Sequence, residues 1–133
     1  MATIKSFTSL EQSKKLAEIL PLESADMRIG NYIGESGKVD GTNVHYYPKG
    51  ESFGAPEIIN AWSLAALLEQ FPYELCDDDG NSLYLEINKE DDIYQLVYAD
   101  RYGDFESIET DRHEHFVDAC YEMVIKLNKL NLL

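Results

Sequence analysis

The side chains best suited to chemistry lie in the second half of the chain, beginning with an aspartate-rich stretch. Asp77 and Asp79, with an asparagine two residues further on, have the spacing of the first ligands in an EF-hand calcium loop. Such a loop also needs glycine at its sixth position and glutamate at its twelfth, where this chain has Ser82 and Asn88. We therefore expect a hairpin turn in which Gly80 supplies a positive φ, and we predict no dedicated metal site.

A second cluster contains histidine and cysteine, which are common ligands of zinc. His113 and His115 stand two residues apart on an expected helix, so their side chains diverge by about 200° and do not share one metal. His45 is distant in sequence. Cys120 falls on the apolar stripe of that helix, where a thiol packs as a small hydrophobic group and stays protonated. The sequence thus predicts neither a zinc site nor a cysteine nucleophile.

Two other kinds of chemistry have weak support. The stretch Gly34–Gly37 lacks the spacing of a phosphate-binding loop, and Glu35 would repel a phosphate. Carboxylates are numerous, but numerous exposed carboxylates are typical of a solvated face and identify no acid–base pair. We accordingly predict no catalytic residue and no cofactor, and a small enzyme with an unrecognised site stays as an alternative.

The chain is strongly acidic, with a formal net charge of −14 over 133 residues. The segment Glu74–Glu122 holds 16 acidic and 3 basic residues, so it carries −13 of that charge. This argues against direct binding to nucleic acid, whose phosphates require a Lys/Arg surface, and against binding to an anionic membrane. Two cysteines without a paired motif, no recognisable signal peptide and no long apolar run predict a cytoplasmic protein.

Several of the nine tyrosines fall on expected strands of the same acidic segment. One interpretation is that they are amphipathic side chains closing the edge of the core. The other is an acidic, tyrosine-bearing sheet face that binds another protein, because tyrosine is favoured at interfaces. Under the second interpretation the candidate interaction surface consists of Asp77, Asp79, Tyr84, Asp91, Asp92, Tyr94 and Tyr98.

The elements that would position these residues are organised around the densest apolar run, which contains the only tryptophan. In the segment Asn60–Pro72, apolar residues recur at the three-and-four spacing of a buried helix face. Asn60 is the expected N-cap, with Ser63 as the competing choice, and Pro72 ends the helix. Together with the C-terminal helix it supplies the predicted core: Trp62, Leu64, Leu67, Leu68, Phe116, Cys120, Val124 and Leu127.

An earlier helix is predicted to begin after Thr8, whose side chain would form a capping box with Glu11, and to end at a proline. Residues 22–59 contain six of the eight glycines and are expected to be a loop or an irregular hairpin. In the hairpin alternative, Met27–Ile33 pairs with Val44–Tyr47.

After Pro72 the apolar pattern changes to period two, which is typical of strands with one buried face. Strands are expected at Tyr73–Cys76, Leu83–Ile87 and Ile93–Ala99, and a fourth at Phe105–Ile108. Short polar turns would join them into an antiparallel meander.

The last helix is predicted to begin at Asp111, which has capping-box spacing with Glu114. Its buried stripe continues to Leu130. Glu122 and Lys126 have the i,i+4 spacing of a stabilising ion pair.

Several short segments carry a further pattern: Leu16–Pro21, Glu23–Met27, Trp62–Leu64 with Leu67, Leu68 and Pro72, and Asp118–Cys120 with Met123, Lys126 and Leu127. In these segments the chain resembles a group of small uncharacterised proteins carried by phages and mobile elements of gut anaerobic bacteria. The resemblance covers both ends and the central helix, but neither residues 30–59 nor the sheet. It implies a bacterial or phage cytoplasmic setting, and it implies no activity and no site.

These patterns predict a single α+β domain, residues 1–133, in which three helices pack on one face of an antiparallel meander of three to four strands. For function, the favoured class is a non-enzymatic interaction protein whose acidic face meets a basic protein partner. The alternatives are a nucleic-acid mimic, which occupies the DNA site of a host enzyme, and the small enzyme named above. The sequence does not indicate an oligomeric state.

Overall fold

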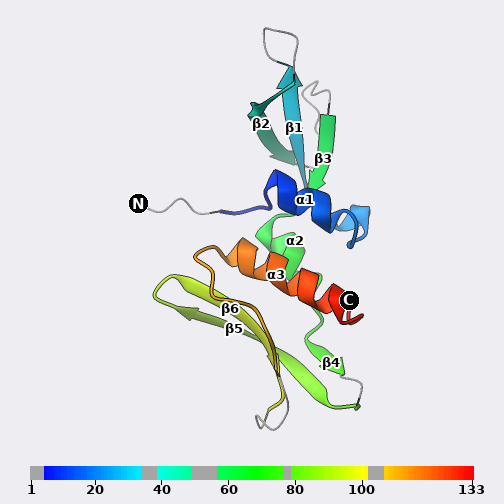
Figure 1. Ribbon diagram of the computed structural model, residues 1–133, viewed down its shortest axis with the longest axis vertical. Coiled ribbons are helices and arrows are strands. Elements are labelled where there is room, and N and C mark those ends of the chain that lie inside the picture. Colours follow the sequence, from blue (N-terminus) through cyan, green and yellow to red (C-terminus); the bar gives the residue numbers. More distant parts are fainter. Residues whose placement is uncertain (1–4, 34–38, 49–56, 77–78, 102–106) are drawn as a thin grey trace. The chain divides into compact units, whose positions relative to one another are not determined.

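The computed structural model describes residues 5–33, 39–48, 57–76, 79–101 and 107–133 (Figure 1). Helices and antiparallel strands are both present, so the protein has the α+β fold class that the sequence predicts. The chain divides into two compact units, Phe7–Ala66 and Leu67–Leu133, the second of which includes Met1–Ser6. That the chain behaves as one domain stays a prediction.

The unit Phe7–Ala66 is built on a three-stranded antiparallel sheet. β1 (Met27–Ile33) lies in its centre, between β2 (Val39–Pro48) and β3 (Glu57–Ala61). The β1–β2 pair is therefore the hairpin alternative, and β1 has the bounds expected for it. β2 begins before Val44, because pairing with β1 continues past a register shift to the Ile33–Val39 pair. The glycine-rich stretch Gly34–Gly37 lies outside the described residues.

α1 (Leu10–Leu16) packs against β3 and is capped one residue later than predicted. The Ser9 hydroxyl accepts the Gln12 N–H at 3.2 Å, and the Gln12 side-chain oxygen accepts the Ser9 N–H at 3.0 Å. The predicted Thr8–Glu11 capping box is thus wrong, because the buried Thr8 hydroxyl bonds that of Ser13 at 2.7 Å instead.

Trp62 is fully buried, as predicted, but it lies between β3 and the next helix rather than within a helix. Its backbone N–H donates to the Thr8 hydroxyl at 3.1 Å, and its carbonyl accepts the Thr8 N–H at 2.9 Å. Its indole N–H donates to the Ser24 hydroxyl at 2.9 Å, in the 3₁₀ turn Leu22–Ser24. The helix predicted from Asn60 is wrong at its start, because long-range bonds occupy the backbone groups that helical bonds would use.

The helix that does form is α2 (Leu64–Leu68), while Asn60 belongs to β3. Ser63, the competing choice for the cap, accepts the Ala66 N–H on its hydroxyl at 3.2 Å. Leu67 is fully buried, whereas Leu64 and Leu68 are half-buried. The core prediction therefore holds best for Trp62 and Leu67.

The unit Leu67–Leu133 contains the antiparallel four-stranded meander predicted from the period-two pattern (Figure 1). β4 (Glu74–Cys76), β5 (Ser82–Glu90), β6 (Ile93–Ala99) and β7 (Ile108–Glu109) pair in chain order. β6 has its predicted bounds. The fourth strand was expected to start at Phe105, but residues 102–106 lie outside the described part of the chain.

Two turns of the meander use left-handed backbone conformations. Gly80, before β5, has φ +82°, as predicted. The two-residue turn between β5 and β6 consists of Asp91 and Asp92, with φ of 48° and 62°. This is the sign pattern of a type I′ turn, which matches the twist of a hairpin but prefers Asn-Gly.

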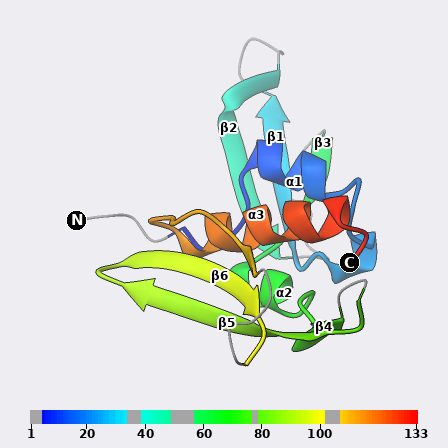
Figure 2. The same ribbon diagram turned by 60° about the horizontal axis from the view of Figure 1, so that its bottom comes forward.

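α3 (Phe116–Lys129) packs against β6 on one face of the meander (Figure 2). It is capped at His115 and not at Asp111, so the predicted second capping box is wrong. The reason is that the Asp111 backbone N–H already donates to Glu122.

The predicted stripe of α3 is mostly confirmed. Cys120, Val124 and Leu127 are fully buried, and Phe116 is half-buried with its ring 5.0 Å from that of Tyr94. Leu130 is 53% exposed, contrary to prediction, because it is the C-cap and no longer follows the buried stripe.

Candidate functional site

The pairing of β5 with β6 decides which side chains share a face of the meander. Tyr84 opposes Ala99, and Leu85 opposes Tyr98. Directly opposed residues lie on the same face, and successive residues alternate between faces. Tyr84 therefore lies on one face, while Tyr94 and Tyr98 lie on the other. The predicted face bearing all three tyrosines does not form.

Tyr98 has to be removed from the candidate surface. It is fully buried on the face that α3 covers, and its hydroxyl donates to the Pro72 carbonyl at 2.6 Å. Burial also raises the pKa of Tyr98 above its ordinary range. Tyr94, on the same face, is half-buried between Phe116 and the Lys89 ammonium, which lies 5.5 Å from its ring centroid. Both tyrosines thus fit the interpretation in which they close the core.

The other face, which we call the open face, carries most of the exposed acidic strand residues. The ladders show that Glu74 opposes Tyr84 and that Glu109 opposes Val97, so both glutamates lie on it. Glu86 and Glu90 follow Tyr84 at alternate positions of β5. The open face is defined by Glu74, Cys76, Ser82, Tyr84, Glu86, Asn88, Glu90, Ile93, Gln95, Val97, Ala99 and Glu109.

One aromatic cluster lies at the β4 end of the open face. The Arg101 guanidinium lies 4.5 Å from the Tyr84 ring centroid, and the Tyr73 ring lies 5.7 Å from that of Tyr84. Tyr73 is 70% exposed. Arg101 therefore has a local aromatic partner on this face.

The predicted surface aspartates are exposed but do not form one patch. Asp79 precedes β5, whereas Asp91 and Asp92 follow it. The nine residues of β5 span about 30 Å, so these aspartates lie at opposite ends of the strand. Asp77 lies outside the described residues. The glutamates of the open face, which the sequence prediction did not single out, connect the two ends.

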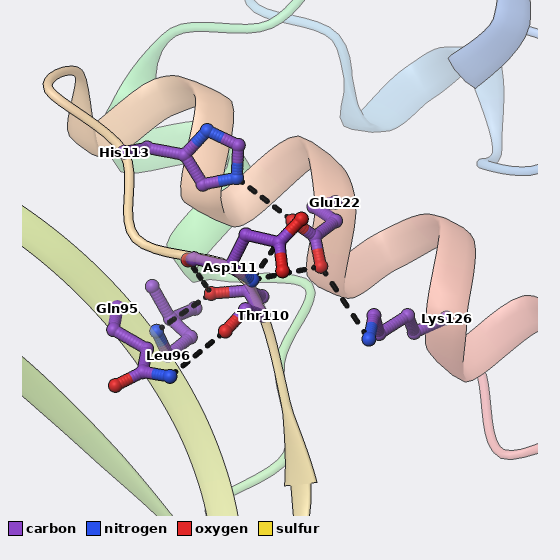
Figure 3. Close-up of polar contacts among 7 residues, drawn as sticks. All are labelled: Gln95, Leu96, Thr110, Asp111, His113, Glu122 and Lys126. Carbon is purple, nitrogen blue, oxygen red and sulfur yellow. Dashed lines mark hydrogen bonds and ion pairs between the residues drawn. The ribbon is translucent and has the colours of Figure 1, made fainter.

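The chain after β7 continues alongside β6 through a set of side-chain bonds (Figure 3). The Thr110 N–H donates to the Leu96 carbonyl at 3.0 Å, and the Leu96 N–H donates to the Thr110 hydroxyl at 3.1 Å. The Gln95 side-chain amide donates to the Thr110 carbonyl at 2.8 Å. The buried hydroxyl of Thr110 thus takes the place of a backbone carbonyl in the ladder.

A bulge causes this substitution. Beyond Thr110, Tyr94 and His113 exchange two backbone hydrogen bonds of 2.7 and 2.9 Å. Between these two contacts, residues 111–112 face the single residue Gln95, which is the arrangement of a β-bulge. His113 therefore belongs to this ladder and not to the helix predicted from the sequence.

Glu122 of α3 binds the backbone group that the bulge releases. Its carboxylate oxygens accept the Asp111 N–H at 3.0 and 3.1 Å, and Oε1 lies 2.8 Å from His113 Nε2. Oε2 lies 3.5 Å from Lys126 Nζ, which confirms the predicted ion pair. Burial alone would raise the pKa of Glu122, but the bonds from His113 and Asp111 and the charge of Lys126 outweigh it and lower that pKa. Glu122 thus anchors the bulge to α3.

A hollow of about 640 Å³ lies at the turn end of β5 and β6. Glu90, Ile93 and Gln95 of the open face line it together with Arg112 of the bulge. The rest of the lining is Ile87, Asn88, Lys89 and Asp91, so acidic, basic, amide and aliphatic side chains all contribute to it. This mixture suits a polypeptide surface better than a small ligand of one charge.

The two thiols differ in exposure. Cys120 is fully buried, and burial raises its pKa to about 12, which confirms that it packs as a protonated core group. Cys76 is exposed on the open face. Among the described residues, no three His, Cys, Asp or Glu side chains are grouped so as to hold a metal ion. In the same residues, every helix is too short or too polar to cross a membrane.

Comparison with known proteins adds no relative: the chain matches no protein-family model, and no curated protein or solved structure is significantly similar to it. The resemblance to phage and mobile-element proteins therefore stays a prediction from the sequence.

Sequence inspection missed the open-face glutamates as a set and the Thr110–Glu122 network. The sequence did contain a signal for the open-face glutamates. A two-residue turn at Asp91-Asp92 makes Glu90 oppose Ile93, and counting back along both strands from this pair puts Tyr84 and Tyr94 on opposite faces of the sheet. No local pattern indicates the second, because Glu122 reaches Asp111 only once α3 is packed on the meander.

Proposed function

We propose that this protein is a non-enzymatic interaction protein whose open face binds a basic protein partner. The supporting observation is that Glu74, Glu86, Glu90 and Glu109 expose their carboxylates on one face of the meander. The aspartates of the β5–β6 turn extend this charge beyond the end of the strands. Arg101, a basic residue at this face, is packed on the ring of Tyr84, and Arg112 lies at its turn end.

The charge layout supports the same proposal. The segment that forms the meander and the first half of α3 carries −13 of the net −14 charge. Charge concentrated in this way steers a basic partner toward it and repels DNA and anionic membranes. Because salt screens such attraction over about 8 Å at physiological ionic strength, binding through this face has to weaken as salt rises.

The proposal includes a cytoplasmic setting in a bacterium or phage-infected cell, which the resemblance of the terminal and central segments supports. The nucleic-acid mimic is a special case, in which the basic partner surface is a DNA site. Duplex DNA would then compete with this protein for the partner, and it would not compete in the general case.

The experiment begins with affinity capture from a bacterial lysate and proceeds to titration of the purified partner. We compare a triple variant of the open face, Glu74→Gln, Glu86→Gln and Glu109→Gln, with a control that removes equal charge elsewhere. The control is Glu11→Gln, Glu18→Gln and Glu69→Gln, which changes three exposed carboxylates outside this face. We expect affinity to fall with salt and with the first variant, and to change little with the control.

The opposite pattern contradicts the proposal. If the purified partner binds both triple variants as tightly as it binds the original protein, and binds equally at low and high salt, the acidic face serves solubility and the partner uses another surface.

A further inference from the structure

The outer edge of β5 presents backbone groups that none of the described strands uses. The Leu85 N–H points away from β6 and donates to the Tyr73 carbonyl at 3.1 Å. Because outward N–H and C=O groups recur at every second residue of an antiparallel strand, those of Ile87 and Lys89 point the same way. β4, however, pairs only with Ser82–Tyr84. In the described part of the chain, no strand lies beside Ile87 and Lys89 on this side.

The side chains along this edge differ between the two faces. Glu86 and Glu90 are exposed on the open face. On the opposite face, Ile87 is 46% exposed, which is unusual for an aliphatic side chain within a ladder. Lys89, next on that face, is already engaged by the Tyr94 ring and by Asp92 at 3.7 Å. The edge therefore offers carboxylates on one side and bare apolar surface on the other.

We propose that the outer edge of β5 accepts an extended segment of the partner as an additional antiparallel strand, with basic residues beside Glu86 and Glu90 and an apolar residue beside Ile87. This inference rests on the proposed interaction function and names the segment that the partner supplies. Strand addition satisfies the free backbone groups of an edge, and alternate side chains give the specificity. Antiparallel addition follows the direction of every pair in this meander.

Charge selects this occupant over a second copy of the same chain. Edge-to-edge pairing of two copies would bring together two β5 strands that each carry Glu86, Glu90 and the adjoining Asp91-Asp92 turn. Each chain also has a net charge of −14. Like charges across such a pair are destabilising, whereas a basic strand neutralises them.

The probe is a short peptide of alternating lysine and valine, acetylated and amidated at its ends. In the proposed register each valine opposes Ile87 or Lys89 and exchanges hydrogen bonds with it, because Ile87 and Lys89 direct their backbone groups outward whereas Glu86 and Glu90 direct theirs toward β6. N-methylation of the valines removes the half of these bonds in which a valine N–H donates, whereas N-methylation of the lysines leaves all of them intact. The two methylated peptides have equal charge and equal methyl content, so they form a matched pair.

We expect the unmethylated and lysine-methylated peptides to bind, and the valine-methylated peptide to bind about tenfold or more weakly, since bonds to the edge are lost. Amide hydrogen exchange at Ile87 and Lys89 should slow on binding, with little change at Leu83, which β4 already covers. Reversing the edge charge with Glu86→Lys and Glu90→Lys should switch preference to a glutamate–valine peptide. A second variant, Ile87→Pro, removes an outward N–H without breaking the β6 ladder. It should weaken binding of the lysine–valine peptide about as much as valine methylation does.

Three results would overturn the proposal. The first is equal binding of the two methylated peptides; the second is absence of lysine–valine binding with unchanged exchange at Ile87. The third is slowing of that exchange with protein concentration alone, which would identify a second copy as the occupant. Suppose that the two methylated peptides bind equally but the triple variant of Glu74, Glu86 and Glu109 binds the captured partner more weakly than the original protein does. The edge inference then fails while the proposed function stands. If the triple variant binds the captured partner with full affinity, and this binding does not change with salt, the proposed function fails whatever the peptides do.

Discussion

The carboxylate of Glu122 accepts the backbone N–H of Asp111 at 3.0 and 3.1 Å, although the residues are 11 positions apart. This contact joins the bulge beside β6 to the helix that packs on the meander. A bulge leaves ladder groups without their usual partners. Glu122 gives the Asp111 N–H a partner and also contacts His113 and Lys126.

We predict that Glu122→Gln destabilises the protein by about 1–3 kcal/mol at neutral pH, because charge-assisted hydrogen bonds are lost. The pKa of Glu122 is lowered in the folded protein. Its stabilisation is therefore fully present above the unfolded-state pKa of about 4.3, and is lost as pH falls through the lower folded-state pKa. Urea unfolding followed by circular dichroism should show the original protein and the variant converging in stability in acid.

The control for this prediction is Glu114→Gln, which neutralises an exposed carboxylate on the same segment. It should change stability by no more than about 0.5 kcal/mol, as surface substitutions usually do. A stability gap for Glu122→Gln that stayed constant down to strongly acidic pH would mean that ionisation of Glu122 is not what anchors the bulge.

The β5–β6 turn gives a prediction of the opposite sign. Asp91 and Asp92 both occupy left-handed backbone conformations, with φ of 48° and 62°. Replacing the pair by Asn-Gly should stabilise the protein by about 0.4–1 kcal/mol, because this dipeptide adopts a type I′ turn more readily. Replacing it by Ala-Ala should destabilise it. Melting temperatures that move in the same direction for both replacements would contradict the turn assignment.

Burial of Trp62 makes it a centre of stability. Trp62→Ala should cost about 3–5 kcal/mol, because a large buried ring and its packing are lost. Trp62→Phe should destabilise the protein less, because an aromatic ring is kept and the main loss is the 2.9 Å hydrogen bond from the indole N–H to Ser24. Tyr73→Ala, which changes a side chain that is 70% exposed, is the control. Equal melting temperatures for Trp62→Ala and Tyr73→Ala would show that the Trp62 ring is not in a packed core.

The thiols should react at very different rates with a disulfide reagent at neutral pH. Cys76 is exposed, whereas Cys120 is fully buried with a pKa raised to about 12. The thiolate is the reactive form, so one equivalent should react quickly and the second only on unfolding. Cys76→Ser should abolish the fast phase. A fast phase that persists in Cys76→Ser would place Cys120 within reach of solvent.

The strands were predictable from the sequence where one face is buried and turns are short. Ile93–Ala99 has its predicted bounds, because its period-two alternation lies between polar segments, and Met27–Ile33 has the bounds given in the hairpin alternative. The segment Asn60–Pro72 was not predictable, because apolar residues at three-and-four spacing also occur when a strand, a bridge and one helical turn follow one another. The bonds from Trp62 to Thr8 decide the outcome, and they cross 54 positions of sequence.

The candidate site divides in the same way. That the acidic turns are exposed follows from their composition, and Asp79, Asp91 and Asp92 are exposed. Which tyrosines share a face depends on strand register. Tyr98 was predicted to lie on the surface, but it lies on the buried face of β6, because the apolar residues of the strand and not the type of residue determine which face is buried. The free edge of β5 depends on where β4 stops pairing, and no residue pattern within β5 shows this.

The positions of Trp62 and Cys120 have a consequence for spectroscopy. The only tryptophan belongs to the unit Phe7–Ala66, and the shielded thiol belongs to the unit Leu67–Leu133. Intrinsic fluorescence and thiol accessibility, followed through one denaturant series, therefore report separately on the two halves without any introduced dye. Coincident midpoints are the signature of one cooperative transition, so unmodified protein carries its own pair of probes for domain-wide cooperativity.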